Sequence, residues 1–129
     1  LSTISLIAPA IAMGNRVVLI PSQRYASVAL ELVQTLETSD IPPGVINIVT
    51  GNKGELADQL AGHAEVDGIW CWSDDETVAK VEATSAADLK RLWVHQEGDR
   101  DWLDPQQGEG LEFLRNATEV KNIWTPYGD

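Results

Sequence analysis

Pro42-Pro43-Gly44-Val45-Ile46-Asn47-Ile48-Val49-Thr50-Gly51 reads as a short buried strand set between helix breakers. An earlier β-branched run, Val17–Ile20, has the same character and ends at Pro21; it is predicted as a strand buried on both faces. Between the two runs, apolar residues recur at helical spacing from Tyr25 to Glu37. A strand, a helix and a strand in this order predict a parallel β-α-β unit.

The same alternation continues along the chain. Helices are predicted near Glu55–Ala61 and Asp75–Ala83, and strands at Gly68–Trp72 and Leu92–Val94. The prediction is therefore an α/β fold with an open parallel sheet and helices on both faces. The apolar segment Leu1–Met13 lacks the basic start of a signal peptide and is too short to span a bilayer. It is predicted as a buried helix, and a chain that opens directly in it is expected to be a fragment.

Composition restricts the partners and the compartment. The 129 residues carry a formal net charge of −11, which disfavours nucleic acid and anionic membranes as partners. With 43% hydrophobic and 22% charged residues, the chain can bury a core. A single cysteine, Cys71, excludes an internal disulfide and favours a cytoplasmic location.

The last third of the chain differs from the rest. Residues Glu97–Glu112 are mostly polar, with Trp102 and Leu103 among the few apolar residues, and are predicted to form a surface linker. The run Glu119–Gly128 is rich in β-prone residues, but Pro126 forbids a central position in a sheet. We therefore expect an edge strand or a docking arm at the C-terminal end.

Several stretches together resemble the cofactor-binding domain of aldehyde dehydrogenases. They are the strand runs above with Ala8-Pro9-Ala10 and Gly14-Asn15-Arg16, and the similarity covers Ile4–Ile69, weakens to Gly98 and returns at Ala117–Asp129. The resemblance implies a Rossmann-like domain over residues 1–98, a linker over 99–116 in place of the catalytic domain, and an oligomerisation strand over 117–129. The second, non-catalytic module of the two-module aldehyde dehydrogenases of family sixteen is the most similar pattern.

The first cofactor motif of that family is altered here. Its members carry Lys-Pro-Ser-Glu after the first strand, with the Lys and the Glu on the adenosine ribose. The matching residues are Ile20-Pro21-Ser22-Gln23, in which Ile20 has no donor and Gln23 has lost the charge. The resemblance therefore makes Ile20, Ser22 and Gln23 vestigial positions.

The second motif, Phe-Thr-Gly-Ser-Thr-Glu-x-Gly, receives the pyrophosphate in the family and is replaced by Cys71–Val78. Ser73-Asp74-Asp75-Glu76 has the pattern of a capping box. In such a box the Ser73 hydroxyl would accept a hydrogen bond from the backbone amide of Glu76, and the Glu76 side chain would accept one from the backbone amide of Ser73. Ser73 and Asp74 are then vestigial as well, because the donors that a phosphate needs are occupied and the carboxylates repel it.

The family's catalytic groups are not matched. Its general base maps to His95, and its catalytic thiol lies in the absent domain, so Cys71 is predicted as an inert core residue. One cysteine and two histidines at these spacings predict no metal site. Trp70 and Trp72 share a strand face and either fill the vacated nucleotide cleft, with Trp72 beside any cofactor, or anchor an interface.

The function expected from these residues is a non-catalytic scaffolding and oligomerisation module of a longer aldehyde dehydrogenase that would use NAD(P). We expect no cofactor, and as partners a catalytic aldehyde dehydrogenase module or a second copy of the chain. The alternative is a regulatory module with weak NAD affinity. The candidate interface residues are Val120, Ile123, Trp124 and Tyr127.

Overall fold

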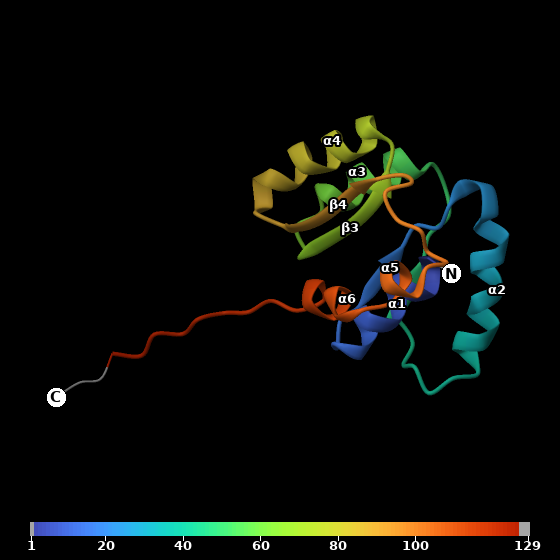
Figure 1. Cartoon of the computed structure of the whole chain (residues 1–129), viewed down its shortest axis with the longest axis horizontal. Coiled ribbons are helices and arrows are strands. Elements are labelled where there is room, and N and C mark those ends of the chain that lie inside the picture. The colour runs from blue at the N-terminus through green and yellow to red at the C-terminus, as the bar shows by residue number, and fades with distance from the viewer. Residues whose placement is uncertain (1, 127–129) are drawn as a thin grey trace.

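The structure is a computed structural model that describes residues 2–126, and Figure 1 shows its elements. The main helices are α1 (Ser2–Ala12), α2 (Ala26–Glu37), α3 (Lys53–Ala61) and α4 (Asp75–Ser85). The strands are β1 (Val17–Leu19), β2 (Ile46–Ile48), β3 (Gly68–Ser73) and β4 (Arg91–Gln96). Two short helices, α5 (Pro105–Gly108) and α6 (Leu111–Asn116), and two 3-10 turns, η1 (Gln23–Tyr25) and η2 (Ala86–Asp88), complete the order.

The α/β class and the parallel strand pairing predicted from the sequence are confirmed. β1 pairs with β2, with Val17 opposite Ile46, and β3 pairs with β4, with Trp70 opposite Trp93. The four strands form two sheets of two strands each, where one open sheet was predicted. Among the described residues, neither β1 nor β2 pairs with β3 or β4, so both edges of each two-stranded sheet are unpaired.

One face of the β3–β4 sheet carries the aliphatic core. Ala57, Ala61 and Val81, from α3 and α4, form a buried cluster, with Ala61 and Val81 at 0% exposure. Ile69, Leu92 and Val94 pack against this cluster. Their alternate positions along the strands place them on one side, because successive side chains of a strand point to opposite faces.

The opposite face carries an aromatic cluster, which we define as Trp70, Trp72, Trp93, Trp102 and Phe113. The ring centroids of Trp93 lie 5.0 Å from Trp70 and 5.2 Å from Phe113, in edge-to-face contacts. Phe113, in α6, is only 2% exposed. The expectation of a surface linker here is corrected: the segment 99–116 forms α5 and α6, buries the Phe113 ring and packs the Trp102 ring against Trp72. The polar composition of this segment did not indicate that Trp102 and Phe113 pack against the tryptophans of the sheet.

The residues that follow this segment connect the two halves of the fold. The Asn15 side-chain amide, just after α1, donates to the carbonyl of Ala117 at 2.8 Å. Arg91 at the start of β4 donates to the carbonyl of Thr118. α1 packs on both β1 and α6, so α6 lies between the β1–β2 half and the β3–β4 half (Figure 1).

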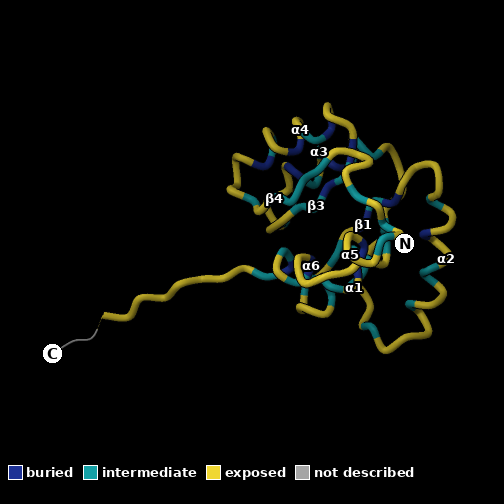
Figure 2. Tube along the Cα trace, viewed as in Figure 1, coloured by how far each residue is buried: buried dark blue, intermediate teal, exposed yellow. Residues whose placement is uncertain are grey.

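The chain leaves the folded body after Thr118. Figures 1 and 2 show this segment extending away from the helices, and it is exposed along its described length. Val120, Ile123 and Trp124 are 88%, 85% and 91% exposed. Up to residue 126 it pairs with no strand of this chain, so an edge strand in its own sheet is not formed. Tyr127, the fourth interface candidate, lies outside the described residues.

Two burial predictions for the first half of the chain are wrong. Val18 in β1 is 45% exposed, so this strand is not buried on both faces. α1 is also covered on one side only, with Ile7 and Ala10 buried but Ile4 half exposed. The described residues of this chain place no second layer over these surfaces.

Candidate functional site

A cavity of about 680 Å³ lies at the carboxyl ends of β1, β2 and β3. This is the edge where open parallel sheets bind ligands. Ser22, Gln23, Ser73 and Asp74 all line it, so four of the five vestigial positions come together around one space. Ile20, the fifth, follows β1 and does not line the cavity.

Gln23 connects two loops at the rim of this cavity by a hydrogen bond. Its side-chain amide donates to the carbonyl of Gly51 at 3.1 Å, which joins the loops after β1 and β2. Ser22 precedes η1, and its hydroxyl makes no capping hydrogen bond. The residue at the family's ribose-binding glutamate position thus holds a neighbouring loop.

Asp74 caps α4, and the prediction that Ser73 does so is wrong. The Asp74 carboxylate accepts from the Thr77 amide at 2.9 Å and from the Thr77 hydroxyl at 3.0 Å. Ser73 is the last residue of β3, 1% exposed, and its hydroxyl donates to Asp74 at 3.1 Å. β3 runs one residue further than predicted, which moves the cap from Ser73 to Asp74. The expectation that a side chain occupies the start of this helix is confirmed.

These hydrogen bonds keep the Asp74 carboxylate at the cavity wall negatively charged. The Thr77 amide, followed by the Thr77 hydroxyl, holds the pKa of Asp74 below its ordinary value of 3.8, so the carboxylate is charged at neutral pH. Glu76 and Glu97 line the same cavity. A pyrophosphate placed here would meet negative charge and a helix amide that already has an acceptor.

Lys53 is a residue of this site that the sequence analysis did not single out. Its ammonium donates to the carbonyl of Trp72. The neighbouring Ser73 carbonyl accepts from the Glu97 amide on the β4 side, so the Trp72 carbonyl points to the open edge of β3. A lysine in the first turn of a helix faces the unfavourable end of the helix dipole. That position was the available signal that Lys53 has a partner outside its own helix.

His95 and Cys71 are not arranged as a base and a nucleophile. The His95 ring stacks on Trp72 with centroids 5.4 Å apart, and its Nε2 is buried without a hydrogen-bond partner among the described residues. Cys71 is 7% exposed, and burial raises the pKa of its thiol. A buried thiol with a raised pKa is a poor nucleophile.

The two tryptophans of β3 do not fill the cavity at the strand ends, and their predicted role as an interface anchor stays a prediction. Trp70 and Trp72 pack into the aromatic cluster, and neither lines the cavity at the strand ends. The Trp72 indole therefore does not lie beside the space where a nucleotide would bind. Its Nε1 is buried without a partner among residues 2–126.

Comparison with known proteins identifies the family. The model of the Aldehyde dehydrogenase family matches residues 1–103. The chain belongs to this family. The resemblance to aldehyde dehydrogenases that the sequence indicated is confirmed at the level of the family.

Curated aldehyde dehydrogenases match most of the chain. The 2-aminomuconic semialdehyde dehydrogenase of Bos taurus is 37% identical over 86 residues, which are 67% of this chain and 18% of that protein. The betaine aldehyde dehydrogenase of Vibrio vulnificus (strain CMCP6) is 36% identical over 118 residues, 92% of this chain and 24% of that protein. The chain thus spans about a quarter or less of the length of these relatives.

Solved aldehyde dehydrogenases share the fold. Aldehyde dehydrogenase C of Pseudomonas syringae, solved with NAD+ and octanal, superposes with a TM-score of 0.69 at 33% identity, over 74% of this chain and 20% of that one. A betaine aldehyde dehydrogenase of Staphylococcus aureus, solved with NAD+, gives 0.68 at 27% identity, over 74% and 19%. The Rossmann-like fold assignment is confirmed by these structures.

Two general features of the described residues complete the picture. Residues 2–126 contain no helix of the length and apolarity that crossing a bilayer requires. Within the same residues, no three His, Cys, Asp or Glu side chains gather in a group able to hold a metal ion.

Proposed function

We propose that the chain is a non-catalytic structural module of an aldehyde dehydrogenase superfamily protein. The observation that carries the proposal is the double hydrogen bond between Thr77 and Asp74. It occupies an amide at the start of α4 and sets a carboxylate where the family binds pyrophosphate. An N-cap of this kind stabilises the helix, while a phosphate site needs the same amides unoccupied.

The catalytic chemistry of the family has no counterpart in the described residues. His95, at the position of the family's general base, is covered by Trp72, and its Nε2 is buried. A general base must reach the proton that it removes, and stacking on Trp72 with the Nε2 buried hinders this. We therefore propose that aldehyde oxidation to acids with NAD(P) belongs to a different module of the parent protein.

The proposed role is assembly. Residues 117–129 would act as the oligomerisation strand, after a Rossmann-like domain at 1–98 and a connecting segment at 99–116. The exposure of Val120, Ile123 and Trp124 supports this, since extended apolar segments add to open sheet edges of partners. The proposed partner is a catalytic aldehyde dehydrogenase module or a second copy of the chain, as in the second module of family sixteen, in the cytoplasm.

Light scattering tests the assembly role with one matched pair of variants. Ile123→Glu places a charge in the extended segment, and Leu103→Glu places it at a leucine that is 77% exposed outside that segment. We expect the molar mass of the assembly to fall only for Ile123→Glu. Equal masses for the wild type and both variants would count against this role.

A second candidate function is weak NAD binding in a regulatory module. Arg24, Lys53 and Lys80 line the cavity of about 680 Å³ and offer positive charge to a dinucleotide. Related structures, such as that from Pseudomonas syringae, hold NAD+. Calorimetry with NAD separates the candidates: saturable binding with a dissociation constant below about 1 mM favours the regulatory module, and weaker or undetectable binding favours the structural one.

A further inference from the structure

A second cavity, of about 300 Å³, lies at the other end of the β3–β4 sheet. Gly68 and Arg91, the first residues of β3 and β4, line it, so it opens at the amino ends of the strands. The site with the vestigial positions lies at the carboxyl ends of the strands. The two cavities share no lining residue.

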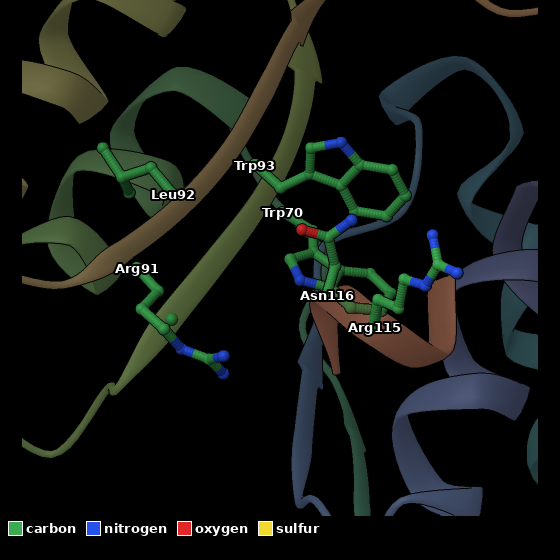
Figure 3. Close-up of a pocket in the computed structure, with 7 residues that line it drawn as sticks. Trp70, Arg91, Leu92, Trp93, Arg115 and Asn116 are labelled. Carbon is green, nitrogen blue, oxygen red and sulfur yellow. The ribbon is translucent and has the colours of Figure 1, made fainter. Parts of the chain in front are cut away.

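The walls of this cavity combine two arginines with two indoles. Figure 3 shows Trp70 and Trp93 at its centre, with Arg91 on one side and Arg115 on the other. Leu92 and Asn116 complete the labelled lining. No Asp or Glu lines it, although the chain has 20 acidic residues against 9 lysines and arginines. The cavity is therefore positive in a strongly negative protein.

The two guanidinium groups are available to an anion. Among residues 2–126, neither Arg91 nor Arg115 forms an ion pair with a carboxylate. Arg91 is held in place by its hydrogen bond to the carbonyl of Thr118. Arg115 makes no side-chain hydrogen bond to the described residues. The guanidinium fork matches the two oxygens of a carboxylate, so both groups suit that ligand.

The two indole rings determine which non-ionic part of a ligand fits the cavity. Trp70 and Trp93 both line the cavity and meet edge to face, with an interplanar angle of 88°, so their indole surfaces form part of its wall. Such surfaces favour a planar aromatic partner over a hydrated inorganic ion. The Asn116 amide nitrogen donates to the carbonyl of Glu112 at 3.0 Å, which leaves its Oδ1 as an acceptor at the rim. We propose that this cavity binds a small aromatic carboxylate between Arg91 and Arg115.

The probe is benzoate, titrated into the ¹⁵N-labelled chain and followed by the indole N–H signals in NMR. We expect saturable shifts at Trp70 and Trp93 with a dissociation constant of about 1 mM or below, and none at Trp124, which is 91% exposed in the extended segment and does not line the cavity. Benzamide has the same shape without the charge, and we expect it to bind at least about tenfold more weakly. Equal binding of the two would overturn the proposal.

The matched variants are Arg115→Gln and Arg16→Gln. Both arginines are exposed, and only Arg115 lines the cavity. We expect Arg115→Gln to weaken benzoate binding at least about tenfold and Arg16→Gln to leave it unchanged. Unchanged binding in Arg115→Gln, or inorganic phosphate saturating the same shifts more tightly than benzoate, would contradict an aromatic carboxylate site. Since the benzamide comparison uses the wild type, it holds even if a variant folds poorly.

Discussion

Asp74 and Thr77 form a closed pair at the start of α4, in which one carboxylate accepts both the backbone amide and the hydroxyl of the same threonine. The resemblance to aldehyde dehydrogenases implies that the pair lies in the segment that receives the pyrophosphate in that family. We propose from this arrangement that the start of α4 serves as structure and does not bind a cofactor.

Replacing Asp74 by alanine removes the cap of α4 and should lower stability. The Thr77 amide then loses its acceptor, and N-cap removal generally destabilises helices. The measurement is the urea midpoint, with Asp75→Ala as the control, because Asp75 lies in the first turn without a capping role. Equal midpoints for the two variants would contradict the assignment of the cap to Asp74.

Acid should weaken the fold through the same carboxylate. The folded-state pKa of Asp74 lies below its ordinary value of 3.8, so its stabilising contribution is complete above that pH and is lost as the pH falls through the lower, folded value. Asp58, whose pKa is lowered by hydrogen bonds from Lys80 and Thr84, adds in the same direction. We expect Asp74→Asn, which can still cap, to flatten the loss of stability below about pH 4. Parallel acid curves for wild type and variant would exclude this linkage.

Phe113→Ala tests whether the segment 99–116 belongs to the fold. The ring is 2% exposed and contacts Trp70, Trp93 and Trp102, so its removal should cost about 3–5 kcal/mol of unfolding free energy. Leu111→Ala, at a position in α6 that is 67% exposed, is the control and should stay within about 0.5 kcal/mol. A small effect of Phe113→Ala would restore the interpretation of a surface linker.

The Cys71 thiol should resist alkylation in the folded chain. It is buried, and its raised pKa leaves little thiolate at neutral pH. Iodoacetamide at pH 8 should modify it slowly, and at a rate that rises sharply in urea. Equal rates in the folded and the unfolded chain would show that this strand is open to solvent.

Local signals in the sequence predicted the elements well. The β-branched run at Val45–Val49 became β2, and the helical spacing after Tyr25 became α2, since both patterns are set by nearby residues. The cap was misplaced by one residue because Ser and Asp both favour that position, and only the end of β3 distinguishes them.

Long-range packing explains the remaining errors. Phe113 and Trp102 meet the sheet tryptophans across many residues of chain, and no local pattern marks that contact. Arg100, expected in a solvated linker, lies within 5.1–5.7 Å of the centroids of four rings and pairs with Glu112. The division into two sheets likewise depends on which strands pair with one another, and the hydrophobic periodicity of a single strand does not show its pairing partner.

The most direct test of the central claim is NAD binding to the wild type and to Asp74→Gly, measured by calorimetry under the same conditions. The variant removes the carboxylate and releases the Thr77 amide. Our account predicts millimolar or weaker binding for the wild type and a gain in affinity for Asp74→Gly. A micromolar dissociation constant for the wild type, equivalent to about −8 kcal/mol, would contradict it.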